Sequence, residues 1–193
     1  MIRSILAGIM ISLGGIIYLS CPNQIVGAIL FSIGLLTILH FQWRLFTGKA
    51  GLLATKDISF SRLMQVLLGN GISCIVLGLS LRFTNWGRTI VQAAAAIVEK
   101  RIDNNILENF ILGVFCGILM YIAVTSYSTK PFVTVMCVAA FILAGFNHCI
   151  ADMFYYTLGT PLQLIPQMLV ALAATICGNV CGCNIIPLLD YKD

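Results

Sequence analysis

Long apolar stretches alternate with short polar ones along most of this chain. Six of these stretches each approach the roughly 20 residues that an α-helix needs to cross about 30 Å of hydrocarbon. They cover approximately residues 4–20, 25–47, 63–84, 109–127, 132–156 and 164–189. The pattern therefore predicts an all-α membrane protein with six transmembrane helices.

Two of the six stretches, the second and the fifth, are interrupted by polar residues near their ends. The second ends in HFQWRLFTG (residues 40–48), and the fifth contains GFNHCIADM (residues 145–153). Such interruptions predict broken helices, whose freed backbone groups must be buried in protein or line water.

The interruption of the fifth stretch places His148 and Asp152 four residues apart. Titratable residues inside hydrocarbon are costly, and the usual reason for tolerating them is a lined cavity or a pathway. A simpler interpretation is that the helix ends in the headgroup region, where both side chains are hydrated. The interruption alone does not decide between the two.

The two interrupted stretches belong to an internal repeat. ILFSIGLL (29–36) resembles AAFILAGF (139–146), and LLGNG (67–71) resembles ICGNV (176–180). Each repeat holds three crossings, an odd number, so the two halves must insert in opposite directions. Inverted repeats with broken helices place a permeation site near the membrane midplane, where the halves meet. The repeat therefore favours the pathway interpretation of His148.

The repeat divides a single transmembrane domain, residues 1–189, into two halves. The first repeat covers about residues 4–84, and the second covers about 109–189. Between them, about residues 86–108 contain IVQAAAAIVEKRI, a helix-forming run that ends in charges and is expected to lie at the membrane interface. The last four residues, 190–193, resemble the start of an epitope tag, so we leave them out of the functional argument.

Composition supports an integral membrane protein. Of all residues, 60% are hydrophobic and 9% are charged, whereas soluble domains average about 25% charged residues. The net charge of +4 forms no basic stripe interleaved with aromatics, which argues against nucleic-acid binding. Counting cations predicts that both termini are cytoplasmic in a cell (inner) membrane. In that topology the cytoplasmic side carries Arg3, Arg44, Lys49, Lys56, Arg62 and Lys130, and the other side carries Arg82, Arg88, Lys100 and Arg101.

The eight cysteines sit almost wholly inside apolar stretches. Cys177, Cys181 and Cys183 lie close together in sequence, but their neighbours are Gly and Asn, and the spacing does not match known zinc sites. Small residues let membrane helices pack closely. We therefore predict a packing role for these cysteines, with no metal and no cofactor.

Several motifs, in order from residue 5 to residue 189, resemble the formate/nitrite transporter family. Residues 44–48 (RLFTG) match its E-L-F-T-G loop, and residues 113–116 (GVFC) match the start of its G-V-L-C-N stretch. Residues 145–153 (GFNHCIADM) match its G-F-E-H-S-x-A-N-M stretch. The two Gly-Asn pairs, within 67–71 and 176–180, fit its third and sixth helices.

The resemblance implies an aquaporin-like fold, a homopentamer, and one pore in each protomer for small monovalent anions or their conjugate acids. It also implies roles for particular residues. His148 would face a central chamber, Thr47 would lie on a mobile loop, and Lys100 would attract anions at the vestibule. By position, Phe31, Met120 and Phe141 would form the periplasmic constriction, and Leu35, Leu45 and Phe46 would form the cytoplasmic one. Without the resemblance, ordinary helix packing would explain these apolar residues.

Elementary electrostatics agrees with a central histidine. An anion at mid-membrane faces a large desolvation cost unless it is neutralised, and apolar constrictions raise the barrier further. A histidine between them can donate a hydrogen bond or a proton, because its charge changes within the physiological pH range.

Four residues depart from the family pattern: Arg44, Asn147, Asp152 and Gly117. Asp152 could stabilise a protonated His148, or it could pair with Arg44, since both lie at breaks of equivalent helices. Gly117 replaces a chamber asparagine and is expected to leave a roomier chamber. Asn147 and Asp152 are both counted among the expected pore residues.

The favoured function is a pore for small monovalent anions and protons, with formate first and nitrite or hydrosulfide next. The alternative is a neutral-solute channel of the water or glycerol kind, although the paired Asn-Pro-Ala boxes of such channels are absent. An enzyme would need a nucleophile–base pair or a metal cluster, and none is visible. A purely structural protein would not explain two polar interruptions. The other histidine, His40, is expected to be structural.

Overall fold

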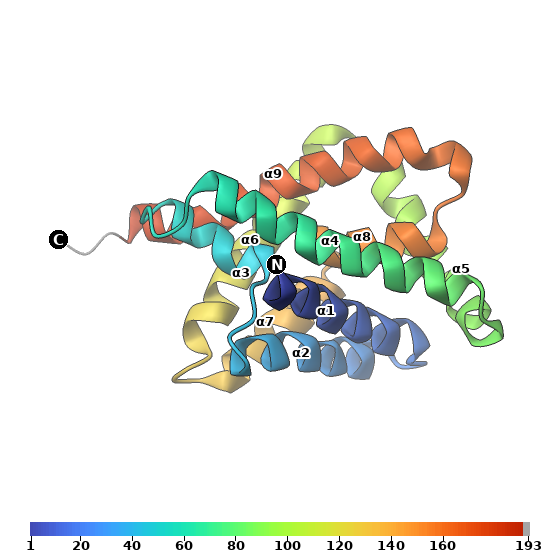
Figure 1. The fold of residues 1–193 in the computed structure, drawn as a ribbon, viewed down its shortest axis with the longest axis horizontal. Coiled ribbons are helices and arrows are strands. Elements are labelled where there is room, and N and C mark those ends of the chain that lie inside the picture. The colour runs from blue at the N-terminus through green and yellow to red at the C-terminus, as the bar shows by residue number, and fades with distance from the viewer. Residues whose placement is uncertain (191–193) are drawn as a thin grey trace.

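The structure is a computed structural model that describes residues 1–190, and its regular elements in that range are all helices. Of the predicted tag remnant, residues 191–193 lie outside the described residues. The elements are α1 (Ile2–Ser20), α2 (Gln24–His40), α3 (Phe46–Ala50), η1 (Gly51–Leu53), α4 (Phe60–Arg82), α5 (Asn85–Asp103), α6 (Ile106–Ser126), α7 (Pro131–Leu143), α8 (Cys149–Gly159), η2 (Leu162–Leu164) and α9 (Ile165–Leu189) (Figure 1).

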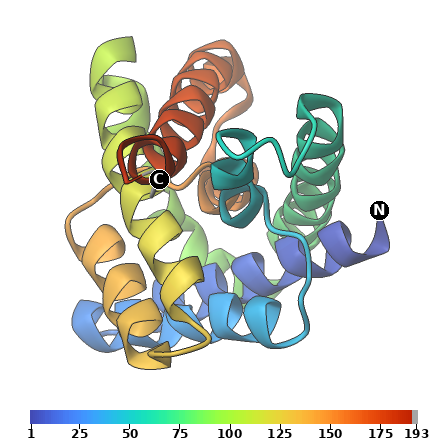
Figure 2. The same ribbon diagram turned by 90° about the vertical axis from the view of Figure 1, so that its left-hand side faces the viewer.

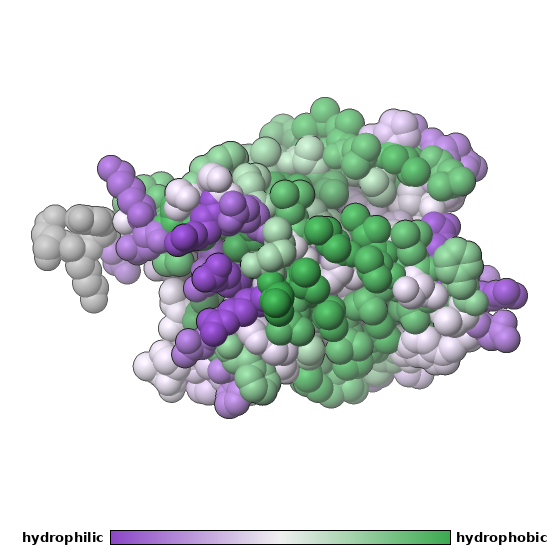
Figure 3. Space-filling view, in the orientation of Figure 1, coloured by the Kyte–Doolittle hydropathy of each residue, from purple (hydrophilic) through white to green (hydrophobic). Residues whose placement is uncertain are grey.

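Four helical stretches are long and apolar enough to cross a membrane: Ile2–Ser20, Phe60–Arg82, Ile106–Ser126 and Leu162–Leu189. The helices α2 and α7 are apolar but shorter. On the visible face, hydrophobic residues form a broad belt, and hydrophilic residues gather at both ends of the long axis (Figure 3). The long axis is therefore the direction in which the helices would cross a bilayer.

The other two predicted spans are each divided between a longer and a shorter helix. Within 25–47, α2 ends at His40 and α3 begins at Phe46; within 132–156, α7 ends at Leu143 and α8 begins at Cys149. Viewed from the end that carries the C-terminus, α3 lies near the centre of the molecule, with the longer helices around it (Figure 2).

Each break contains one residue in the left-handed backbone region. Gln42 has φ 53° in the first break, and Gly145 has φ 75° in the second. A Cβ at Gly145 would meet nothing within 4 Å, so glycine is favoured there by backbone conformation rather than by space.

The start of α3 is held by Asn70 of α4. The Phe46 amide donates to Asn70 Oδ1 at 2.8 Å, and Asn70 Nδ2 donates to the carbonyls of Ser4 at 2.7 Å and Arg44 at 3.0 Å. The N-cap residue Leu45 supplies no side-chain acceptor. A buried amide therefore satisfies backbone groups that lipid could not.

The start of α8 is held in the same way by Asn179 of α9. The Cys149 amide donates to Asn179 Oδ1 at 2.9 Å, and Asn179 Nδ2 donates to the carbonyls of Gly113 and Asn147, both at 2.8 Å. The two asparagines of the sequence repeat thus make matching sets of three hydrogen bonds. The repeated Gly-Asn pairs have a direct structural counterpart.

The predicted linker is largely the helix α5. Its buried residues Ile90, Ala94, Val98 and Arg101 form one face. Part of this face packs on α8, where a Cβ at Gly159 would come within 2.7 Å of the Ala95 nitrogen. The helix α5 is thereby fixed beside the second break.

The expectation of a roomier chamber at Gly117 is wrong. A Cβ there would lie 2.5 Å from the Asn179 carbonyl oxygen and 2.9 Å from the Cys183 nitrogen. Similar contacts surround Gly113 and Gly178, so α6 and α9 pack backbone against backbone. The glycine at 117 serves close helix packing and leaves no extra space in a chamber.

We predict that Gly117→Ala lowers the free energy of unfolding by about 1–3 kcal/mol, because the added methyl group must push apart two backbones. Thermal unfolding of the detergent-solubilised protein measures the change. Gly48→Ala is the control, since a Cβ there meets only side-chain atoms at 3.5 Å and 3.7 Å. Equal destabilisation by both substitutions would contradict the prediction.

Candidate functional site

The central residue of the site is His148, which is 2% exposed and caps the N-terminus of α8. Its Nδ1 accepts from the Ala151 amide at 3.2 Å, and its Nε2 lies 2.9 Å from Thr47 Oγ1. Because Nδ1 accepts an N–H, it carries no proton in this arrangement. We therefore assign the neutral ring with the proton on Nε2, which donates to the Thr47 hydroxyl. This bond joins the starts of α3 and α8.

Two aromatic rings extend from the imidazole. Phe141 stacks on His148 with ring centroids 5.5 Å apart and planes at 18°, and Phe31 meets Phe141 edge-on at 6.2 Å. The three rings face a cavity of about 170 Å³, which we call the Lys100 cavity. Lys100, Arg101 and Asp152 also line it, and so do Tyr18, at the end of α1, and Gln24, at the start of α2. Charged groups and aromatic rings therefore line the same cavity.

A second cavity, of about 210 Å³, lies beside the first break, and we call it the Trp43 cavity. It is lined by residues of α2, the first break, α3 and the end of α6, among them Leu35, Leu45, Trp43 and Lys49. Since α2 begins at the Lys100 cavity and ends at the Trp43 cavity, the two lie toward opposite ends of the molecule.

Some of the predicted pore residues line one of the two cavities, and others are buried and line neither. Phe31 and Phe141 line the Lys100 cavity, and Leu35 and Leu45 line the Trp43 cavity. Three further predicted residues line neither cavity and are at most 2% exposed: Phe46, Thr47 and Met120. The Lys100 cavity and the Trp43 cavity thus lie on either side of a layer of buried residues, and His148 lies at the boundary of this layer.

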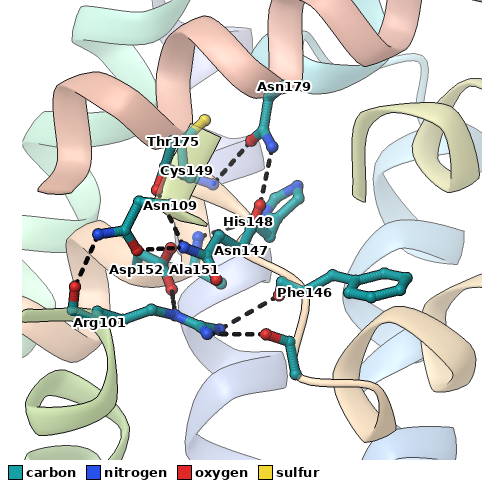
Figure 4. Close-up of polar contacts among 11 residues, drawn as sticks. Arg101, Asn109, Phe146, Asn147, His148, Cys149, Ala151, Asp152, Thr175 and Asn179 are labelled. Carbon is teal, nitrogen blue, oxygen red and sulfur yellow. Dashed lines mark hydrogen bonds and ion pairs between the residues drawn. The ribbon is translucent and has the colours of Figure 1, made fainter. Parts of the chain in front are cut away.

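Arg101 is the functional candidate that sequence reasoning missed. Its Nη1 donates to the Gly145 carbonyl at 2.8 Å, and its Nη2 donates to the Phe146 carbonyl at 3.2 Å (Figure 4). Its Nε lies 3.4 Å from Asp152 Oδ1, which is the one ion pair among residues 1–190. The guanidinium therefore binds two carbonyls of the second break and the Asp152 carboxylate of α8.

Both predicted partners of Asp152 are wrong. The carboxylate contacts Arg101, whereas both ring nitrogens of His148 are bonded elsewhere and Arg44 is exposed. The reason is that α5 brings a cation from outside the two repeats to the break. A signal existed in the sequence, because Arg101 continues the apolar spacing of Ile90, Ala94 and Val98 along one helix face.

Asn147 lines neither cavity. Its Nδ2 donates to Asn109 Oδ1 at 2.7 Å and lies 3.3 Å from Thr175 Oγ1, and Asn109 Nδ2 donates in turn to the Arg101 carbonyl at 2.8 Å (Figure 4). This side chain ties the break to α6 and α9. Its position favours a structural role over contact with a permeating solute.

Lys100 and His40, two residues considered in the sequence analysis, lie at the surface. Lys100 is exposed at the mouth of its cavity. His40 is also exposed, with its ring edge-on to Phe41 at a centroid distance of 4.8 Å.

Comparison with known proteins gives consistent matches. The profile of the family described as formate/nitrite transporter matches residues 1–191. The formate channel FocA of Haemophilus influenzae (strain ATCC 51907 / DSM 11121 / KW20 / Rd) is 28% identical over 158 residues, covering 71% of this chain and 54% of the relative. FocA of Escherichia coli (strain K12) is 26% identical over 187 residues, covering 81% of this chain and 64% of the relative. The chain thus matches between half and two thirds of the length of these relatives.

Two solved structures share the fold. An FNT family ion channel superposes with a TM-score of 0.84 and 21% identity, covering 98% of this chain and 87% of that one. A pentameric formate channel with formate bound gives a TM-score of 0.78 and 24% identity, covering 98% and 93%. Together with the family profile, these matches confirm the resemblance seen in the motifs. This chain belongs to the formate/nitrite transporter family.

Proposed function

We propose that this chain forms a pore for small monovalent anions, with formate as the first candidate and nitrite or hydrosulfide next. The observation that carries the proposal is the position of His148. It is a buried hydrogen-bond donor at the boundary between the Lys100 cavity and the buried layer that contains Phe46, Thr47 and Met120. The relatives named above are formate channels, which supports the same conclusion. The function is transport rather than catalysis.

The architecture that we propose has six membrane crossings in two inverted repeats, as in aquaporin-like folds. In it, α2 with α3 and α7 with α8 are the broken second and fifth crossings. The matching hydrogen bonds of Asn70 and Asn179 support the repeat. We further propose a homopentamer with the pore inside each protomer, because a related structure is described as pentameric. We also propose that the protein lies in the inner cell membrane with both termini in the cytoplasm.

The geometry indicates how an anion would be handled. Lys100 raises the local anion concentration at the cavity mouth. An anion that reaches His148 loses water, and it can accept the Nε2–H once the Thr47 side chain rotates away. Proton donation by the ring would need a second proton on Nδ1, which the Ala151 amide now occupies. In the structure as it stands, His148 is a hydrogen-bond donor, and proton transfer requires the α8 cap to open.

We predict that purified protein in liposomes passes formate, and that flux rises at lower external pH because more anion is neutralised on entry. His148→Ala should reduce this flux about 10- to 100-fold, since a hydrogen bond to a charged group contributes about 1.5–3 kcal/mol. Flux of formate, nitrite, hydrosulfide, lactate and glycerol at two pH values measures the effect. His40→Ala, which removes the exposed histidine, serves as the control and should keep the parent flux.

The same panel tests the alternative. If glycerol passes, the anions do not, and His148→Ala changes nothing, the chain is a neutral-solute channel with this fold. If an anion passes and its flux depends on His148, the chain is an anion pore, and the solute with the highest flux is assigned as its substrate.

Lys100 is the exposed cation at the Lys100 cavity, because the neighbouring Arg101 already binds Asp152 and two carbonyls. We predict that Lys100→Gln lowers anion flux about two- to tenfold at low ionic strength. The loss should shrink as salt is raised, because ions screen exposed charges over about 10 Å. Arg88→Gln is the control: Arg88 is exposed on the same helix but does not line the cavity. Equal losses in both variants would refute a local role for Lys100.

A further inference from the structure

Two buried cysteines make equivalent contacts in the two halves of the molecule. Cys74 of α4 has its Sγ 3.4 Å from the Ile150 carbonyl oxygen and 3.7 Å from that of Gly8. Cys183 of α9 has its Sγ 3.3 Å from the carbonyl oxygens of both Thr47 and Gly117. Both thiols are fully buried. The match extends the repeat one helical turn beyond Asn70 and Asn179.

These thiols connect the halves crosswise. Asn70 binds the start of α3, in its own half, whereas Cys74 on the same helix binds α8. Asn179 binds the start of α8, whereas Cys183 on the same helix binds α3. Each short helix is therefore held by an amide from one half and by a thiol from the other.

The two thiol contacts converge on the hydrogen bonds of His148. The Ile150 carbonyl that Cys74 contacts belongs to the same peptide unit as the Ala151 N–H, which donates to Nδ1. The Thr47 carbonyl that Cys183 contacts belongs to the residue whose hydroxyl lies 2.9 Å from Nε2. Cys74 thus contacts the peptide unit that binds Nδ1, and Cys183 contacts the residue that binds Nε2.

We propose that Cys74 and Cys183 are positioning residues for His148, and that together they set the tautomer and the orientation of its ring. Cys74 holds the peptide that keeps Nδ1 free of a proton. Cys183 holds the hydroxyl toward which the Nε2–H points. The consequence for transport rests on the proposed anion pore, but the effect on the ring does not.

A thiol suits this position because it is a small, weak donor that fits among closely packed helices. Such a contact contributes little compared with an amide hydrogen bond. The expected effects on the ring are therefore shifts of population by about two- to fivefold rather than loss of the fold.

The test is ¹⁵N NMR of histidine-labelled protein in lipid, in a His40→Gln background that leaves His148 as the only histidine. The spectrum separates protonated from unprotonated ring nitrogens. Cys74→Ala should raise the share of the tautomer with the proton on Nδ1 about two- to fivefold. Cys183→Ala should keep the tautomer but speed exchange of the Nε2 proton with water by a similar factor.

The control is Cys116→Ala, which removes another fully buried thiol; no hydrogen bond joins it to the rest of the described chain. It should leave the His148 spectrum unchanged, and serine at position 74 or 183 should restore the parent spectrum. If Cys74→Ala and Cys183→Ala both match Cys116→Ala, the proposal is wrong.

Formate flux, measured on the same samples, separates this inference from the proposed function. Spectral changes with a matching two- to fivefold fall in flux support both. Spectral changes in a protein whose parent passes no anion support the positioning role and overturn the pore.

Discussion

Two short helices, α3 and α8, start at the fully buried residues Phe46 and Cys149, and the site depends on how their free N–H groups are satisfied. Hydrocarbon offers no hydrogen-bond partner, so each start must be capped from within the protein. Asn70 and Asn179 do this from long neighbouring helices, and each also binds the carbonyl of a residue in the break itself. The breaks are therefore fixed structural features, and they bring Thr47 and His148 within hydrogen-bond distance.

A buried ion pair lies beside the second break, and the described residues contain no counterpart of it at the first break. Arg101 and Asp152 form a buried pair whose guanidinium also binds two carbonyls of the break. A buried ion pair is weak evidence of net stability, but removing one partner is costly because it strands the other. Here the pair compensates charge locally, so that Lys100 alone is left to present a cation at the cavity mouth. The imidazole beside the pair is bound by neutral groups and can remain uncharged.

The sequence predicted a large part of this. Apolar runs located the four long membrane-span candidates, and the polar interruptions lie where α2 and α7 end and where α3 and α8 begin. The repeated Gly-Asn pairs contain the two asparagines that cap α3 and α8. Two assignments failed and one residue was missed for the same reason: each depends on which way a helix face turns. Gly117 faces α9 rather than a chamber, Asp152 faces α5, and Arg101 points inward beside an outward Lys100. Spacing fixes relative positions on one helix, but which neighbour a face meets is set by packing.

In the proposed pore, α3 borders the buried layer, and the hydrogen bonds that hold α3 differ in strength. Its flanks are held by two amide side chains, with Asn70 at the Phe46 nitrogen and Asn184 at the Ala54 nitrogen, both at 2.8 Å. Thr47, the second residue of α3, is held by the Cys183 thiol through its carbonyl and by His148 through its hydroxyl. A thiol contact is the weaker kind. In the proposed pore, rotation of the Thr47 side chain alone would release His148 while the amide hydrogen bonds that flank α3 stay in place.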